Sequence, residues 1–542
     1  MPNLDGQLTL LDTRGLVQRA AAAHDLEYLF RHALIQDAAY GSLLRADRRR
    51  LHEQVAAILE DGEAGGLDEV APVLAHHCAA AGDAARARAY YERAGAHALG
   101  RFSNQEAAAH YRAALDLAAP AADQARLLAG LGQALVSQSQ FAEGIATWRA
   151  AVAAYQAEAD GEGLARAYAA LAFAIFGAGD PPGAVAICTE ALAALAIYPE
   201  SPGRAVLLNE TARAYLFTGH PAEAQQTARQ AQALAAQYGD HPTQIAALIT
   251  IGATQARTPA AARATLEQAV ALADGADLPA LARLAHHHLG VRFVELGAIR
   301  TARVHFQRAA TLAGQTGYAA LELFAGVMAC YCTIWLGEWA TAAADLPRLQ
   351  HLAASIDSPT TGVRFLRLAA AALRRYQGPD GAALPDLEAV MAEAWSTGDL
   401  LFQIASAWEV SALLLEQRAW DRAQTLLEAV IPMSDRDVLF GRAWPRYRLS
   451  RVAAGTGDLA TAHRLAAEAD TLAGAAPLLP DQVEAARAAA DLAGAEGRWP
   501  AAQQAYAAAG AALAQMGKHW ERARTLQAAA AAAQAASTPA WP

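Results

Sequence analysis

The residues that could support catalysis or metal binding are few, and their spacing favours neither. Lys518 is the only lysine. It lacks the upstream glycine and the following Ser or Thr of a phosphate-binding loop, so nucleotide hydrolysis by that route is not expected. His286, His287 and His288 are adjacent, and neighbouring side chains on a helix point about 100° apart. Three such side chains cannot converge on one metal ion.

The other reactive side chains also favour a structural role. Cys330 and Cys332 lie in an apolar, helical stretch, which predicts buried thiols. No nucleophile elbow is present to anchor a Ser-His-Asp triad. The sequence therefore predicts no catalytic residue, no metal site and no cofactor of its own, and the protein is not expected to be an enzyme.

The composition favours a helical protein of a reducing compartment. Hydrophobic residues make up 54% of the chain and are mostly alanine, the strongest helix former. The net charge of −11 argues against direct nucleic-acid binding. Four cysteines in 542 residues are not a disulfide framework. Since neither a signal peptide nor an apolar stretch of about 20 residues is evident, a cytoplasmic location without membrane contact is expected.

A turn signal recurs about every forty residues. It begins with glycine at six positions, which form three pairs 40 residues apart: Gly179 and Gly219, Gly297 and Gly337, and Gly457 and Gly497. Degenerate copies occur at 139–141, 257–259, 378–380 and 418–420. Of these, only the copy at 378–380 begins with glycine. Such regularity indicates a repeat protein.

Each repeat combines an alanine-rich helix, the turn and a second helix. Glycine suits the left-handed end of the first helix. A bulky residue follows at the start of the second helix, and an alanine lies three residues further on, which lets the two helices approach closely. The bulky residues are Phe141, Ile299, Trp339, Trp420, Leu459 and Trp499. Five tryptophans are expected to pack between helices, with one or two facing a groove: Trp335, Trp339, Trp408, Trp420 and Trp444.

This pattern resembles the tetratricopeptide repeat family. The family's usual repeat is about 34 residues, so these repeats are expected to have extended second helices or linkers. The resemblance implies an all-α fold, a right-handed α-solenoid of helix hairpins with a period of about 40 residues. We expect the repeats to fill residues 61–536, and residues 537–542 to form a tail.

Residues 1–60 do not follow the repeat. They predict a short helix, a break at Gly15, a strand from about Leu16, a returning strand at Leu26–Phe30, and a helix that carries Ala33, Leu34, Ala38, Leu43 and Leu44. The strings Phe30–Tyr40 and Arg48–His52 resemble the junction between winged helix and repeats in bacterial STAND-class signal-transduction ATPases, which are often fused to nucleotide cyclase domains. The resemblance implies a partial winged helix.

His32 is the residue for which the resemblance implies a cofactor role. In related switch ATPases, a histidine at the corresponding place faces bound ADP. Here only the histidine of that motif is kept, in Arg31-His32-Ala33, so nucleotide sensing would require an ATPase domain, and packing at the strand–helix junction is the alternative. Arg48–Arg50 are expected to form a solvated or interdomain face.

These features lead to three hypotheses about function. The first is a protein-interaction or sensor module of a STAND-type signalling or transcription-regulating system, which binds a protein, peptide or inducer in the concave groove of the repeats. Its ATPase or cyclase domain would lie in trans or upstream. The second is a free-standing scaffold. The third is a sensor of a small-molecule effector held inside the superhelix. We also expect Leu8, Leu11, Leu16 and Leu29 to expose apolar surface that a partner covers.

Overall fold

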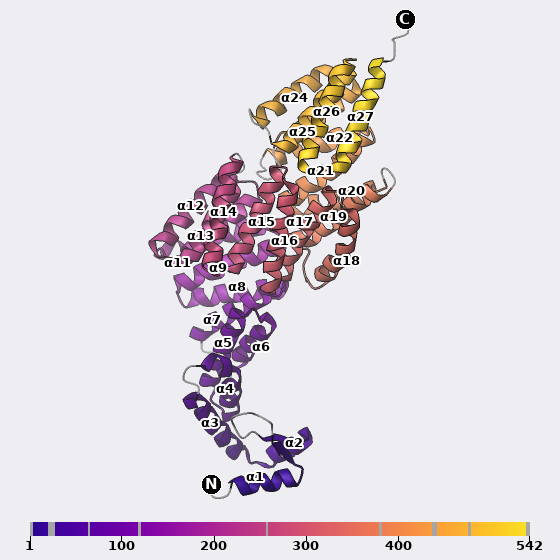
Figure 1. The fold of residues 1–542 in the computed structure, drawn as a ribbon. Coiled ribbons are helices and arrows are strands. Elements are labelled where there is room, and N and C mark those ends of the chain that lie inside the picture. Colours follow the sequence, from indigo (N-terminus) through magenta and orange to yellow (C-terminus); the bar gives the residue numbers. More distant parts are fainter. Residues whose placement is uncertain are drawn as a thin grey trace. The chain divides into compact units, whose positions relative to one another are not determined.

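The chain folds into two compact units that are almost entirely helical (Figure 1). The structure is a computed structural model, and it describes residues 4–19, 28–62, 66–117, 121–255, 258–378, 382–435, 442–474 and 478–537. Unit 1 comprises Met1–Arg101 and Glu106–Pro120, and unit 2 comprises Phe102–Gln105 and Ala121–Pro542. In the described residues no helix is both long and apolar enough to cross a bilayer.

Unit 1 begins with the order helix, strand, strand, helix that the sequence predicts. Strands β1 and β2 pair antiparallel, with Val17 opposite Phe30; Leu26 lies outside the described residues. Gly15 has a φ of +70°, so it marks the expected break before the first strand. The elements are α1 (Leu4–Thr13), β1 (Val17–Arg19), β2 (Tyr28–Phe30), α2 (Ala33–Ser42), α3 (Arg45–Gly62), α4 (Leu67–Ala81), α5 (Ala84–Gly100) and α6 (Asn104–Asp116), which begins in unit 2.

The predicted helix after β2 is broken in the structure, which corrects one expectation. Helix α2 ends at Ser42, and Leu43 is extended with a φ of −75° and a ψ of 140°. The Ser42 hydroxyl donates to the Ala39 carbonyl at 2.7 Å, which competes with continuation of the helix. Leu43 and Leu44 therefore lie between α2 and α3 rather than inside one helix.

Unit 1 exposes an unusual amount of apolar side chain. Leu11 and Leu29 are exposed and Leu8 and Leu16 are half-buried. Three others are more exposed still: Leu34 at 81%, Leu44 at 73% and Ile58 at 70%. This part of the chain has the apolar surface expected of a segment that contacts another protein.

Unit 2 is a series of helix hairpins. The helices are α7 (Ala121–Ser137), α8 (Phe141–Ala157), α9 (Gly161–Gly177), α10 (Pro181–Ala194), α11 (Pro202–Phe217), α12 (Pro221–Gln237), α13 (His241–Thr254), α14 (Pro259–Gly275), α15 (Pro279–Glu295), α16 (Ile299–Gln315), α17 (Ala319–Trp335), α18 (Trp339–Ala354), α19 (Thr361–Gln377), α20 (Leu384–Thr397), α21 (Leu400–Glu416), α22 (Trp420–Ser434), α23 (Trp444–Thr456), α24 (Leu459–Ala473), α25 (Leu479–Ala495), α26 (Trp499–Met516) and α27 (His519–Ser537). A 3₁₀ turn, Leu195–Ile197, follows α10. The fold is an α-solenoid of tetratricopeptide-like hairpins.

The forty-residue period arises from both helices of a repeat rather than from an extended second helix. Helices α15, α16 and α17 each have 17 residues, and short turns of equal length separate them. The expectation of an extended second helix is therefore incomplete, because the first helix is lengthened by the same amount.

All six turn glycines adopt positive φ: Gly179, Gly219, Gly297, Gly337, Gly457 and Gly497. Ser139 and Arg418 take the same conformation in the degenerate turns, with φ of 62° and 56°; residues 256–257 and 379–381 of the other two copies lie outside the described residues. At the starts of the second helices, Phe141 and Ile299 are buried, and Trp339, Trp420, Leu459 and Trp499 are half-buried. A Cβ on Gly177 would lie 2.5 Å from the Phe141 ring, so this glycine permits the close approach of α8 and α9.

A second set of turns joins one repeat to the next, and these turns are not part of the recurring signal found in the sequence. Gly239 and Gly398 also have positive φ. The aspartates that follow them, Asp240 and Asp399, cap α13 and α21 through hydrogen bonds of 3.1 Å from the amides of Thr243 and Phe402. The pair Gly-Asp thus ends one helix and starts the next.

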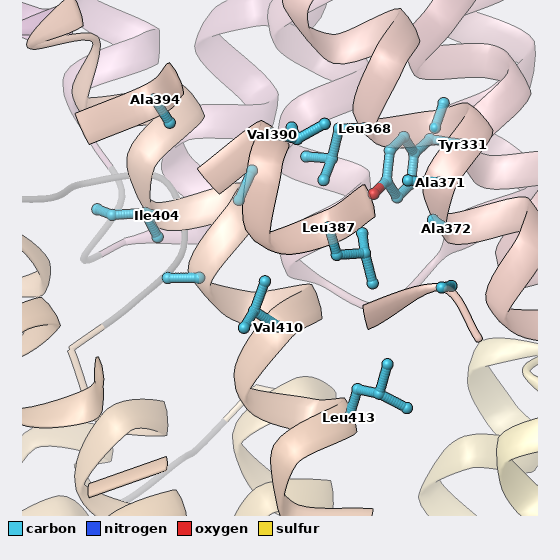
Figure 2. Close-up of a cluster of buried hydrophobic side chains, with 14 of the residues drawn as sticks. Tyr331, Leu368, Ala371, Ala372, Leu387, Val390, Ala394, Ile404, Val410 and Leu413 are labelled. Carbon is cyan, nitrogen blue, oxygen red and sulfur yellow. The ribbon is translucent and has the colours of Figure 1, made fainter. Parts of the chain in front are cut away.

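The core of unit 2 consists of several clusters of small and branched side chains. Figure 2 shows part of it, where leucine, valine and alanine side chains from α19, α20 and α21 lie together near Tyr331 of α17. Alanines such as Ala371, Ala372 and Ala394 are fully buried. Their small volume lets neighbouring helices pack closely along the solenoid.

The solenoid of unit 2 closes on itself after about five repeats. The Ser139 hydroxyl accepts a hydrogen bond from the Ala320 amide, 181 residues away. The Asp357 carboxylate accepts from the Phe141 amide over 216 residues, and Arg364 donates to the Gly179 carbonyl over 185 residues. Since a simple solenoid has only neighbour contacts, these bonds show that successive superhelical turns touch.

The same closure recurs at the C-terminal end of unit 2. Trp520 of α27 packs against Tyr376 and Trp339, with ring centroids 4.8 and 6.4 Å apart. Gly297, in the turn before α16, approaches Leu479 and Met516. The inner face therefore surrounds a space that is partly open to solvent.

Candidate functional site

The inner helices of unit 2 enclose a cavity of about 760 Å³. Its wall comes from α11, α12, α13, α15, α16 and α17, from α19 and α21, and from α24 to α27, together with Arg442 and Ala443 just before α23. Its lining residues include Phe217, His287, Trp335, Trp408, Asp481 and Lys518. A volume of this size is typical of sites for small molecules or short peptide segments.

Aromatic side chains and cations form the C-terminal wall of the cavity. The Arg448 guanidinium lies 4.2 Å from the ring centroid of Trp408 and 4.9 Å from that of Trp444. The Nζ of Lys518 lies 4.8 Å from the ring centroid of Trp335. These cation–π contacts fix the orientation of two tryptophans that face the cavity.

The charge of Arg448 is fully compensated. It forms two hydrogen bonds to the Glu484 carboxylate, of 2.9 and 3.3 Å, and two more to the Trp408 carbonyl and the Ser411 hydroxyl, of 2.6 and 2.7 Å. The Arg448 and Glu484 side chains are only 3% and 2% exposed. A buried pair of this kind is tolerated because each of the three guanidinium nitrogens donates to an acceptor.

Three further ion pairs lie at or beside the cavity wall; two of them join helices of different repeats, and the third is a local contact three residues along the chain. Arg375 of α19 contacts Glu409 and Glu416 of α21 at 2.9 and 2.6 Å. Lys518 contacts Glu521 at 3.0 Å. Burial alone would raise the pKa of Glu521, but Lys518 and Arg487 outweigh it and hold that pKa at about 2. The carboxylate is therefore charged at neutral pH.

Asp481 is the lining carboxylate without such compensation. Burial, and then the nearby Glu484, raise its pKa to about 6. It lies in the first turn of α25, where the helix dipole partly stabilises a negative charge. No ion pair joins it to another of the described residues.

The three consecutive histidines are spread over different environments rather than gathered at a metal. His287 and His288 are buried and line the cavity, whereas the Nδ1 of His286 lies 2.9 Å from the Nδ1 of His305 on α16. Burial, and then Arg283, lower the pKa of His287 to about 3, so it is neutral at physiological pH. The described residues contain no group of three or more His, Cys, Asp or Glu side chains placed to bind a metal ion.

The other residues singled out in the sequence have structural surroundings. Cys330 and Cys332 are buried free thiols, and burial raises the pKa of each to about 12. His32 is exposed at the position before α2, and its side chain makes no cap hydrogen bond. Within Arg48–Arg50, Arg48 lies over the Tyr40 ring at 5.1 Å and Arg50 pairs with Asp47 at 3.1 Å.

Sequence reasoning missed most of the cavity wall. Trp335 and Trp408 were among the tryptophans expected to pack or to face the groove, and Lys518 was considered only as part of a phosphate-binding loop. Arg448, Glu484 and Arg375 gave no signal, because their partners lie 34 to 41 residues away on other helices. A search for oppositely charged residues about one repeat apart could have found these pairs.

Comparison with known proteins adds similarities of fold only. No protein-family profile matches the chain, and no curated protein sequence matches it. Among solved structures, a Rap protein complexed with competence and sporulation factor is 13% identical with a TM-score of 0.49, over 64% of this chain and 98% of the other.

Two further structures show weaker similarity. A STAND protein with a tetratricopeptide repeat sensor from Pyrococcus horikoshii is 13% identical with a TM-score of 0.41, over 72% of this chain and 58% of the other. The human IFIT1 dimer is 14% identical with a TM-score of 0.40, over 80% of this chain and 96% of the other. The class of this protein, a tetratricopeptide-like α-solenoid, rests on the hairpins and turns described above.

Proposed function

We propose that this protein is a sensor and interaction module, and that the molecule it senses, its effector, binds inside unit 2. The observation that carries the proposal is the cavity of about 760 Å³ inside unit 2, which is partly open to solvent. It is too small for a folded partner, but it suits a small molecule or a short peptide segment. Helices from two superhelical turns form its wall, so an occupant would contact both turns and would stabilise their closure.

The partner that receives the signal is proposed to contact unit 1. The exposed apolar side chains of that unit, including Leu34, Leu44 and Ile58, support a protein partner. The order α1, β1, β2, α2 is compatible with the end of a winged helix within residues 1–60. We propose a STAND-type ATPase as this partner, in trans or upstream, and His32 would contact nucleotide only in its presence.

The cavity proposal is tested by what the purified protein retains. The full chain is isolated from its native cell and denatured, and the released small molecules and peptides are identified by mass spectrometry. Ala405 lies in the cavity wall, so Ala405→Trp would fill part of the space. A matched control is Ala264→Trp, at an exposed position on α14.

We expect wild type and Ala264→Trp to release the same compound, and Ala405→Trp to release little or none. Circular dichroism would establish that each variant is folded. An equal yield from all three proteins, or no compound from wild type, would contradict the proposal.

The partner proposal has a separate test. Affinity capture from the native cell, with the intact mass of the bait determined in parallel, is expected to recover a nucleotide-binding ATPase or a longer bait that contains one. Hydrogen exchange should then show protection of residues 1–60 only in the complex. Recovery of unrelated proteins, with uniform protection of that segment in the isolated chain, would favour the scaffold hypothesis instead.

A further inference from the structure

The inner wall of unit 2 contains a second polar cluster beside the cavity, built from α9, α11, α15 and α17. Arg213 and Tyr318 lie around the ring of Phe173, and Arg283 is close enough to both of them for their charges to affect its pKa. The Arg213 guanidinium lies 4.9 Å from the Phe173 centroid, and the ring of Tyr318 lies 6.0 Å from the same ring. Four inner helices thus bring two cations and a hydroxyl to one place.

Arg283 is the unusual member of this cluster. It is partly buried, and it forms no ion pair or hydrogen bond with any of the described residues. Burial, and then repulsion by Arg213, lower its pKa to about 10, so it remains charged at neutral pH. None of its nitrogens is among the fully buried polar atoms that lack a partner, so an anion could reach the guanidinium.

Neighbouring groups do not supply that partner. Arg213 is already paired with Glu210, through contacts of 3.0 and 3.1 Å. His287, one helical turn beyond Arg283, is neutral because its pKa is near 3. The cluster therefore contains two guanidinium groups and one carboxylate.

Tyr318 provides an independent observation. Its hydroxyl oxygen is buried and has no hydrogen-bond partner among the described residues. Buried hydroxyls are rarely left unsatisfied, and the hydroxyl could donate to an acceptor placed beside the cluster. A donor without an acceptor and a cation without an anion are both found here.

The cluster is connected to the cavity by aromatic contacts. Phe176 lies 4.7 Å from the Arg213 guanidinium and 4.8 Å from Phe217, measured between ring centroids for the second pair. Phe217 in turn lines the cavity and lies 6.4 Å from the His288 ring. A molecule in the cavity could therefore extend a charged group past Phe217 to Arg283.

We propose that Arg283, assisted by Arg213 and the Tyr318 hydroxyl, binds an oxyanion, either a carboxylate or a phosphate group. This inference rests on the proposed function, since the oxyanion would belong to an effector whose apolar part occupies the cavity. Arg283 supplies the charge and paired N–H donors, and Tyr318 supplies one further donor. Specificity for an anionic effector follows from this cluster, whereas its size is limited by the cavity.

The test uses the full chain and two simple probes. Inorganic phosphate and acetate are titrated separately at constant ionic strength, and binding is followed by calorimetry and by the rise in unfolding temperature. Sodium chloride is the reference. We expect one or both probes to bind wild type, and the stronger of the two distinguishes a phosphate-bearing effector from a carboxylate.

Two variants locate the site. Arg283→Gln should weaken binding of the stronger probe about tenfold or more, because a charge-assisted contact is lost. Tyr318→Phe should weaken it by a smaller factor. Arg229→Gln, at an exposed position on α12 with no ion pair among the described residues, is the control and should bind as wild type does. Circular dichroism is used to verify folding.

The outcomes separate this proposal from the cavity proposal. Binding that depends on Arg283 supports the oxyanion site even if Ala405→Trp retains the native compound. No binding of either probe to wild type, or equal binding to Arg283→Gln, would overturn it. A marked loss of stability in unliganded Arg283→Gln would also overturn it, because that result would reveal an internal partner for this arginine.

Discussion

The two parts of the inner wall of unit 2 treat buried charge in opposite ways. In the C-terminal part, Arg448, Arg375 and Lys518 each contact a carboxylate within 3.0 Å. In the part formed by α11 and α15, Arg283 has no carboxylate partner, and the Tyr318 hydroxyl has no acceptor among the described residues. In the first arrangement each charge has its counter-ion, whereas the second leaves a buried hydroxyl unsatisfied, which costs stability. The contrast distinguishes a structural network from a binding site.

The largest expected loss of stability comes from removing a carboxylate in the C-terminal part of the wall. Glu484→Ala would leave Arg448 buried without its counter-ion, and we expect the free energy of unfolding to fall by about 3–5 kcal/mol. Denaturant titration measures this loss. Glu428→Ala, on the exposed face of α22, should cost less than about 0.5 kcal/mol. A similar small loss for Glu484→Ala would show that the pair contributes nothing to the fold.

Removing an aromatic contact between superhelical turns should have the next largest effect. Trp520→Ala deletes the packing of α27 against Tyr376 and Trp339, and we expect a loss of about 2–3 kcal/mol, less than for a fully buried tryptophan. Hydrogen exchange should rise in α27 and in α18. The neighbouring His519→Ala, at an exposed position, is the control and should leave both helices protected. Unchanged exchange in Trp520→Ala would mean that this contact does not hold the turn closed.

Acidification should affect the two parts of the wall over different pH ranges. His287 has a pKa near 3 in the folded protein and about 6.5 when unfolded. Between these values the unfolded state binds more protons, so stability falls as the pH is lowered from 6.5, by up to about 1.4 kcal/mol per pH unit. Glu521, with a pKa of about 2 in the folded protein, contributes stability above about 4.3, the usual value for glutamate, and loses it only as the pH falls towards 2.

Hydrogen exchange at pH 5 would therefore distinguish the two regions. We expect increased exchange in α15 while α27 remains protected. His287→Gln should reduce the dependence of stability on pH between 6.5 and 5, because its amide does not titrate. Equal exchange in both helices at pH 5 would contradict the assignment of these groups.

The smallest expected effect comes from removing a tyrosine hydroxyl, and one tyrosine in each part of the wall allows a direct comparison. Tyr447 donates to Asp470 at 2.8 Å, so Tyr447→Phe should lose about 1 kcal/mol of stability. The Tyr318 hydroxyl has no such partner, so Tyr318→Phe should leave the unliganded protein equally stable or slightly more stable. Thermal unfolding of both variants measures the difference. A comparable loss in the two would mean that the Tyr318 hydroxyl is satisfied.

The local architecture of unit 2 could be predicted from sequence because its signals are local. Gly297 and Ile299 mark one turn within three residues, since a left-handed conformation and a buried side chain each restrict the residue type. Ser139 and Arg418 show the limit of this logic, because they adopt positive φ without being glycine. The break at Leu43 was missed for a related reason: the apolar pattern continues through it although the backbone does not.

The closure of the superhelix and the site could not be predicted in this way. The bond between Ser139 and Ala320 joins residues 181 apart, and nothing in a single repeat specifies which later repeat it meets. Arg283 is likewise one of many arginines, and only the lack of an ion pair with the described residues sets it apart. Such information lies in the pitch of the superhelix, which depends on the sum of many small packing angles.

Closure after about five repeats also constrains how this protein can change over evolutionary time. An open solenoid can gain or lose a repeat, because each repeat contacts only its neighbours. Here the loss of a single repeat between Ser139 and Ala320 would bring a different helix opposite Ser139. It would also separate the Phe141 amide from the Asp357 carboxylate. We therefore expect the number of repeats within one superhelical turn to stay constant among related proteins. Their length should vary at exposed loops instead.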